Sequence, residues 1–162
     1  MSATIIARRV DGDRPVRVVI AGTTIASVEP AGEAETPPDV YVAPGFIDLQ
    51  INGYGGVWFS DAKVTPEAVL GVLEAYPAHG VTRLLPTVIT GPLEAMCQGL
   101  AAVRQACERE AWAEHMVAGC HVEGPFLSPE DGPRGAHRAS TSAPADWPTS
   151  RRCSGLRAIG LN

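Results

Sequence analysis

The sequence lacks any apolar run of the roughly 20 residues that a membrane-spanning helix requires. Its N-terminus also lacks the basic-then-apolar order of a secretory signal. The net charge is −5, and the 13 lysines and arginines form no long basic run, so a nucleic-acid surface is not expected. Together these absences predict a cytoplasmic protein that binds neither membranes nor nucleic acids.

The usual cysteine motifs are missing as well. The four cysteines include no Cys-x-x-Cys pair and have no histidine at zinc-site spacing: Cys97, Cys107, Cys120 and Cys153. They are expected to be reduced, buried thiols, which excludes a zinc knuckle and a disulfide framework. No Gly-x-Ser-x-Gly motif is present, so no covalent nucleophile of that kind is indicated.

Residues 1–43 have the composition of a small all-β region. β-branched residues dominate three runs that glycine separates, over 5–10, 16–20 and 23–28. The next segment, 29–39, is rich in proline, glycine and glutamate, which is typical of a surface loop. So small a meander is not stable alone, and we expect it to pack against the remainder of the chain.

From residue 44 strands and helices alternate. Apolar runs predict strands over 44–51, 81–89 and 116–123. The order strand–helix–strand–helix–strand predicts an α/β fold with parallel strands. Three such strands cannot cover both faces of their own sheet. They are therefore expected to be the first three β/α units of a (β/α)8 TIM-type barrel, which needs about 250 residues.

Two helices connect these strands. Thr65 and Pro66 form a helix start, with threonine at the N-cap and proline at the first helical position. The apolar face of that helix is expected to contain Val69, Leu70, Leu73 and Tyr76. Pro92 opens the second helix, which is expected to end near Glu110.

The strand end around Glu123 carries the strongest chemical signal. His121 and Glu123 are two residues apart, so in a strand they point to the same face. A carboxylate buried at a sheet rim is costly unless it is paired or bound to a metal. Two interpretations remain about equally supported by these residues: a metal ligand with an imidazole beside it, or a rim carboxylate satisfied by backbone amides and a core histidine.

Further polar residues are expected at the same edge. Gln50 and Asn52 come at the end of the strand over 44–51 and place two amides on one face. Taken alone, these two residues favour a simple amide pair that caps the strand end. The segment 52–56 is expected to be a glycine-rich loop. His137 lies on the loop after the third strand and could reach the same edge of the sheet.

Several motifs together resemble a known family, the N-acetylglucosamine-6-phosphate deacetylases of the metal-dependent amidohydrolase superfamily. They are the run 44–53 with Gly55-Gly56, Leu85-Pro86-Thr87, the run 121–126, and Gly135-Ala136-His137. The resemblance covers about residues 1–137. It implies a small β-sandwich, to which the N-terminus contributes, joined to a distorted (β/α)8 barrel.

The resemblance also implies roles for individual residues. Glu123 matches the metal-binding glutamate after strand three, and His137 matches a histidine that contacts the sugar substrate. Gln50 and Asn52 line the site where most of the superfamily has His-x-His, which implies one divalent metal ion, zinc or another transition metal such as iron. No role carries over to His121, for which the core interpretation stands.

The implied reaction is hydrolysis of the acetamide of N-acetylglucosamine 6-phosphate to glucosamine 6-phosphate and acetate, in amino-sugar catabolism. The general acid/base aspartate, the other metal ligands and the phosphate-contacting residues are expected beyond the end of this chain. One glutamate cannot hold the ion alone, so we expect the 162-residue chain to be inactive by itself. The full-length family member is expected to be a homo-oligomer.

The chain is thus expected to comprise three segments: 1–43 as part of the β-sandwich, 44–137 as the first part of the barrel, and 138–162 as an irregular tail. The tail shows neither strand nor helix periodicity, and we expect it to be translated out of frame. Two rival functions remain. One is another amidohydrolase acting on a cyclic amide or a dipeptide, which the Gln50-x-Asn52 pair disfavours. The other is a non-catalytic barrel remnant that acts as an interaction module.

Overall fold

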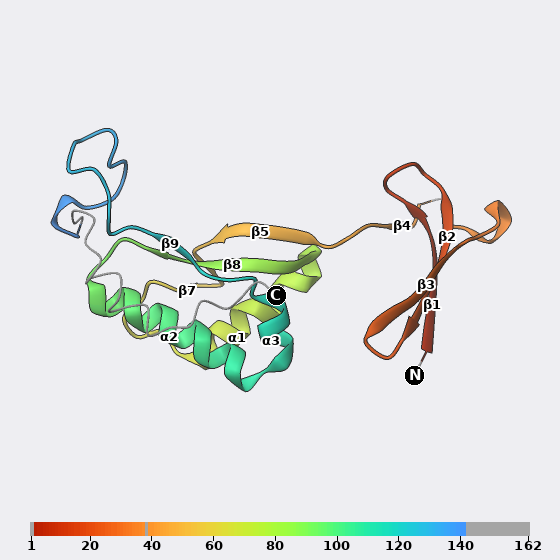
Figure 1. Ribbon diagram of the computed structural model, residues 1–162, viewed down its shortest axis with the longest axis horizontal. Helices are drawn as coiled ribbons and strands as arrows, with labels where there is room; N and C mark the ends of the chain where they lie inside the picture. Colours follow the sequence, from red (N-terminus) through yellow and green to blue (C-terminus); the bar gives the residue numbers. More distant parts are fainter. Residues whose placement is uncertain (1, 38, 142–162) are drawn as a thin grey trace. The chain divides into compact units, whose positions relative to one another are not determined.

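A computed structural model describes residues 2–37 and 39–141 (Figure 1). The chain divides into two compact units, the first comprising Met1–Pro44 and the second beginning at Gly45. The expected tail, 138–162, lies outside the described residues from position 142 onward.

The N-terminal unit is one four-stranded sheet with the strand order β3-β2-β1-β4. Its strands are β1 (Ser2–Arg9), β2 (Pro15–Ala21), β3 (Thr24–Pro30) and β4 (Tyr41–Val42). The first three pair antiparallel, as a meander, and β4 pairs parallel with β1. The three expected strands are thus present, and a short 3-10 turn (Glu33–Glu35) interrupts the expected loop.

The second unit contains a parallel sheet with the order β5-β8-β9. Its strands are β5 (Phe46–Ile51), β8 (Val81–Ile89) and β9 (His121–Glu123). The helices are α1 (Pro66–Ala75), α2 (Leu93–Arg109) and α3 (Ala111–Met116), with a 3-10 turn after α1 (Tyr76–His79). All three α-helices lie on one side of the sheet (Figure 1). The expected mixed α/β class is confirmed.

Local signals explain where α1 begins and ends. The Thr65 hydroxyl accepts a hydrogen bond from the Ala68 amide at 3.2 Å, and Pro66 occupies the first turn. This is the expected cap, which satisfies one of the amides that a helix start leaves unpaired. The helix continues as a 3-10 turn and stops at Gly80, whose φ of 77° suits glycine because it has no Cβ.

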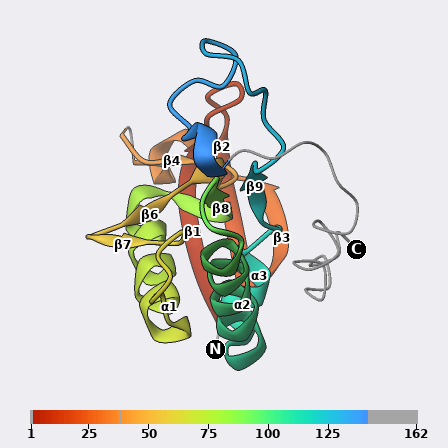
Figure 2. The same ribbon diagram turned by 90° about the vertical axis from the view of Figure 1, so that its left-hand side faces the viewer.

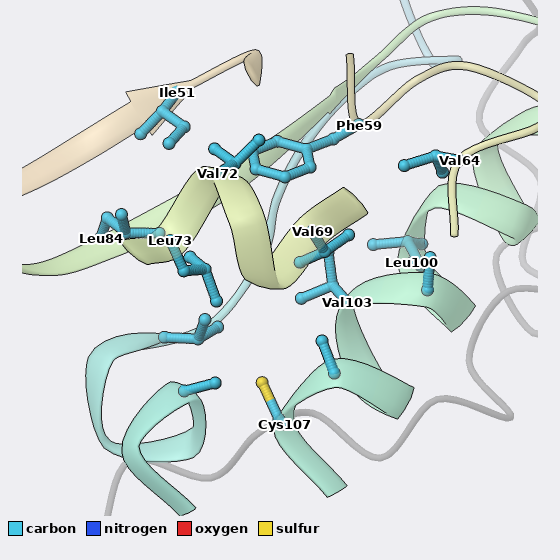
Figure 3. Close-up of a cluster of buried hydrophobic side chains, with 14 of the residues drawn as sticks. Ile51, Phe59, Val64, Val69, Val72, Leu73, Leu84, Leu100, Val103 and Cys107 are labelled. Carbon is cyan, nitrogen blue, oxygen red and sulfur yellow. The ribbon is translucent and has the colours of Figure 1, made fainter. Parts of the chain in front are cut away.

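The core of this unit lies between the helices and the sheet. Val69 of α1 and Val103 of α2 point toward one another, and Phe59 is fully buried above them (Figure 3). Burial of each such side chain contributes about 1.5–3 kcal/mol. On α1 the expected Val69 and Leu73 are buried together with Val72, whereas the expected Leu70 is only partly buried, as is Tyr76, which begins the 3-10 turn after the helix.

The third strand is shorter than expected. Met116 ends α3, and Val117 forms only an isolated parallel bridge with Leu84. The side chains of Met116 and Val117 are buried in the core. The apolar run therefore packs as the end of α3 and the connection that follows it. Gly119, with a φ of 154°, interrupts the extended backbone. The prediction of a strand over 116–123 was therefore wrong for 116–120 and correct for His121–Glu123.

The expected loop at 52–56 is a small hairpin. β6 (Gly53–Tyr54) pairs antiparallel with β7 (Val57–Trp58) around Gly55 and Gly56, both of which have positive φ. Within the hairpin, the backbone of Gly53 lies close to β7, because a Cβ built there would lie 1.9 Å from the Val57 carbonyl oxygen. The glycine pattern indicated the turn but not the pairing.

The described cysteines are reduced. Cys107 is buried, and Cys97 and Cys120 are half-buried. Burial raises the pKa of Cys107 to about 11 and the pKa of Cys120 to about 12. Cys153 lies outside the described residues. No described helix has the length and apolar character needed to cross a membrane.

The two mid-helix glycines provide a matched test of this core. A Cβ at Gly99 of α2 would lie 2.1 Å from the Phe59 carbonyl oxygen, whereas a Cβ at Gly71 of α1 meets nothing within 4 Å. We expect Gly99→Ala to lower the free energy of unfolding by about 1–3 kcal/mol, as overpacking does. Gly71→Ala should raise it by about 0.5–1 kcal/mol, because alanine is the better helix former. Urea unfolding of both variants measures this, and equal midpoints would contradict the close packing of α2 on Phe59.

Candidate functional site

The carboxyl ends of the parallel strands bring polar side chains from distant parts of the chain together. The Gln50 side-chain amide, on β5, donates a hydrogen bond to Oε2 of Glu123, on β9, at 3.2 Å. The central strand β8 lies between these two strands. The hydrogen bond therefore spans the width of the sheet at its carboxyl edge, where parallel α/β folds carry their sites.

His137 joins the same pair. Its Nε2 lies 3.6 Å from Oε1 of Glu123, which makes an ion pair when the imidazole is protonated. The two side chains are 20% and 31% exposed, so solvent screens their interaction only in part. The two carboxylate oxygens of Glu123 thus face different partners, an amide on one side and an imidazole on the other.

Among the described residues, the Glu123 carboxylate has side-chain partners and not the backbone amides that one interpretation proposed. A hydrogen-bonded amide fixes the orientation of a carboxylate, which is how a second partner tunes a metal ligand. Within residues 2–37 and 39–141, no group of three or more histidine, cysteine or acidic side chains could hold a metal ion. Glu123 is therefore at most one ligand of a metal site in this part of the chain.

The other two expected residues behave differently. His121 is half-buried, and its Nδ1 lies 3.4 Å from the Leu49 carbonyl oxygen of β5. The Asn52 side chain is exposed and forms no hydrogen bond with any other described residue, while its carbonyl accepts from the Phe59 amide at 3.0 Å. The structure thus brings together Gln50, Glu123 and His137, and leaves Asn52 at the start of the hairpin.

Thr90 makes a contact that the sequence did not predict. Its hydroxyl donates to the Glu123 carbonyl oxygen at 2.6 Å. Next to it, Gly124 has a φ of 103°, and a Cβ there would lie 1.8 Å from Oγ1 of Thr90. In the sequence, the only signal at Thr90 is its position directly after the strand predicted over 81–89. Thr90 and Gly124 form a close contact that fixes the backbone at the residue carrying the carboxylate.

Comparison with curated proteins finds deacetylases of phosphorylated amino sugars. The chain is 34% identical over 140 residues to the N-acetylglucosamine-6-phosphate deacetylase of Haemophilus influenzae, covering 83% of this chain and 35% of that protein. It is 43% identical over 97 residues to the Bos taurus enzyme of the same name, covering 59% and 23%. An N-acetylgalactosamine-6-phosphate deacetylase from Shewanella is 39% identical over 84 residues, covering 52% and 20%. No family model matches.

Solved structures agree. The N-acetylglucosamine-6-phosphate deacetylase of Pasteurella multocida superposes with a TM-score of 0.67 at 27% identity, over 85% of this chain and 36% of that chain. The enzyme of the same name from Thermotoga maritima gives a TM-score of 0.74 at 24% identity, over 93% and 39%. The second likeness, at its lower identity, supports the fold alone.

The fold and the comparisons define a class: a mixed α/β chain of the kind found in deacetylases of phosphorylated amino sugars. Within that class, the resemblance to N-acetylglucosamine-6-phosphate deacetylases is confirmed, because curated relatives and solved structures of that name match. The chain spans about a third of the length of the Haemophilus influenzae relative. This is consistent with an N-terminal part of such an enzyme.

The Thr90 contact can be tested directly. Thr90→Val keeps the shape of the side chain and removes the donor, so we expect it to lower the free energy of unfolding by about 0.5–1.5 kcal/mol, the net contribution of a typical hydrogen bond, because the acceptor is partly buried. It should also shift the amide NMR signals of Glu123 and Gly124. Thr90→Ser keeps the hydroxyl and is the matched control. A loss of stability in Thr90→Ser as large as or larger than that in Thr90→Val would contradict the role of the hydrogen bond, because serine keeps the hydroxyl and valine does not.

Proposed function

We propose that this chain supplies the first part of a metal-dependent N-acetylglucosamine-6-phosphate deacetylase. The reaction is hydrolysis of the substrate acetamide to glucosamine 6-phosphate and acetate. The observation that carries the proposal is the position of Glu123, held between Gln50 and His137 at the carboxyl edge of the sheet. The similarity to deacetylases of that name supports the same conclusion.

The proposed architecture is a (β/α)8 barrel of which β5, β8 and β9 are the first three strands. In support, all three are parallel and the α-helices cover one side of their sheet. Several apolar side chains of β5 are exposed, Phe46, Ile47 and Leu49 among them. Parallel sheets are normally covered on both faces, so these side chains suit contact with further barrel elements. The N-terminal sheet is proposed as part of a β-sandwich, over residues 1–43, with the barrel part over 44–137.

Glu123 is the residue proposed to bind one divalent metal ion, zinc or another transition metal such as iron. The donor set fits in part: its carboxylate is half-buried, oriented by the Gln50 amide, and close to an imidazole. A bound metal would polarise the acetamide carbonyl and lower the pKa of a water molecule. Gln50 would hold the carboxylate in place. Further ligands must come from elements other than the described ones, since zinc sites need about three protein ligands.

His137 is proposed to contact the sugar, with Gln50 and Asn52 lining the site. A solved deacetylase from Mycobacterium smegmatis, in complex with N-acetyl-D-glucosamine-6-phosphate, matches 95% of this chain with a TM-score of 0.71. At 22% identity this likeness concerns the fold. His137, on a loop above the carboxyl edge, has both an imidazole donor and an acceptor for sugar hydroxyl groups.

N-acetylgalactosamine 6-phosphate is the second candidate substrate, because the Shewanella relative is named for it. The two sugars carry the same acetamide and the same phosphate, so both fit the proposed chemistry. A cytoplasmic location and a homo-oligomeric full-length enzyme complete the proposal. The reduced described cysteines suit that compartment.

Acetate release tests the proposal. We expect the 162-residue chain alone to release no acetate from N-acetylglucosamine 6-phosphate. A hybrid in which residues 1–137 replace the matching part of the Haemophilus influenzae enzyme should release it in a metal-dependent manner. Glu123→Gln in the hybrid should lower kcat/KM by at least about 100-fold, because it removes a metal ligand. Glu94→Gln, at the exposed first turn of α2, should leave kcat/KM unchanged.

The same hybrid distinguishes the candidate substrates. We expect a higher kcat/KM for N-acetylglucosamine 6-phosphate than for N-acetylgalactosamine 6-phosphate, and the reverse order would favour the second candidate. A well-folded hybrid that hydrolyses neither sugar, while the parent enzyme remains active, would overturn the proposed function.

A further inference from the structure

The loop after β9 presents His137 to the site. It leaves the end of the sheet and extends away from the helices (Figures 1 and 2). The loop has no strand or α-helix over 124–138, yet His137 returns to within 3.6 Å of Glu123. Contacts within the loop must therefore fix its return path, because an unrestrained loop of this length would lose conformational entropy on holding the histidine there.

Arg134 makes the contacts that fix this path. Its Nε donates to the His137 carbonyl oxygen at 3.0 Å, and its Nη1 donates to the Pro129 carbonyl oxygen at 2.6 Å. Its Nη2 donates to Oδ1 of Asp131 at 3.1 Å. The side chain is only 16% exposed. One guanidinium thus joins the outgoing part of the loop to the residue that carries the imidazole.

Backbone hydrogen bonds reinforce the same turn. The Arg134 amide donates to the Glu130 carbonyl at 3.1 Å, and the Gly135 amide donates to the Gly132 carbonyl at 2.9 Å. Gly135 has a φ of 63°, so the chain reverses just before His137. Arg134 is therefore anchored by its own backbone while its side chain reaches both forward and back.

We propose that Arg134 is a positioning residue for His137. By holding the His137 carbonyl, it places the imidazole beside the Glu123 carboxylate. Arginine suits this role because its planar guanidinium offers donors in a fixed fork, whereas lysine offers a single flexible point charge. The role of Arg134 in catalysis rests on the proposed function, which assigns His137 to the substrate. The contacts that link Arg134 through His137 to Glu123 do not depend on that function.

The alternative role for an arginine on this loop is direct binding of the substrate phosphate. The geometry favours the positioning role, since all three guanidinium nitrogens already donate to the loop itself. Asp131 also supplies a carboxylate to the same guanidinium, which reduces its attraction for a second anion. An arginine that binds the substrate phosphate would keep its guanidinium directed at the site.

The test uses histidine side-chain NMR on the full 162-residue chain. The His137 signals are assigned with His137→Gln. In the otherwise unchanged chain, Glu123→Gln should shift the His137 ring signals, because it removes the neighbouring charge. In the Arg134→Gln background the same substitution should no longer shift them. Arg134→Lys should restore the response only partly, which separates fork geometry from charge.

Arg9→Gln is the matched control. Arg9 also pairs with an acidic side chain in a turn, Asp11, but belongs to the N-terminal unit. In that background the His137 response to Glu123→Gln should be retained in full. The backbone amide spectrum of Arg134→Gln should change only over the loop, as expected for a locally acting residue.

Several results would overturn the proposal. They are a His137 response that persists in Arg134→Gln, no response in the otherwise unchanged chain, and amide changes throughout the second unit in both Arg134 variants. A selective shift of the Arg134 Nε signal on addition of inorganic phosphate would assign the residue to phosphate binding instead. The readout is an imidazole signal, so a failure of the deacetylase assay would leave this test unaffected.

Discussion

Parallel pairing of β5, β8 and β9 is the constraint on which the second unit depends. Parallel strands need long crossover connections, and here α1 and α2 with α3 provide them and supply the apolar face that packs on the sheet. The same pairing places all carboxyl ends at one edge. Gln50 and Glu123 are 73 positions apart in sequence, yet they share a hydrogen bond there. The packing that stabilises the fold therefore also assembles the site.

At that edge the main electrostatic cost is that of the half-buried Glu123 carboxylate. A charge in such a place is stabilised only when it has partners. The carboxylate of Glu123 has an amide and an imidazole as partners, from Gln50 and His137, and the Thr90 hydroxyl holds the Glu123 backbone carbonyl. Three of its neighbours thus come from three different segments. A residue held this way keeps one geometry, which is what a metal ligand requires.

The sheet that carries this site is covered on one face by the described helices. Side chains of β5 such as Phe46 and Leu49 remain exposed, and exposed apolar patches usually mark a contact surface. The chain spans about a third of the length of the Haemophilus influenzae relative. Both facts agree with the proposed barrel, in which further elements would complete the site.

Much of the local structure was determined by the sequence itself. The Thr65-Pro66 helix start, the strand Val81–Ile89 and the end of α2 at Arg109 result from capping, proline placement and apolar periodicity, which act between near neighbours in the chain. The motif resemblance also singled out Gln50, Glu123 and His137. Only tertiary structure decided that 116–120 packs as a helix end and not as a strand, and that Thr90 and Arg134 contact the residues of the site. These outcomes depend on which distant groups come within hydrogen-bonding or packing distance, and that depends on the pairing of the whole sheet.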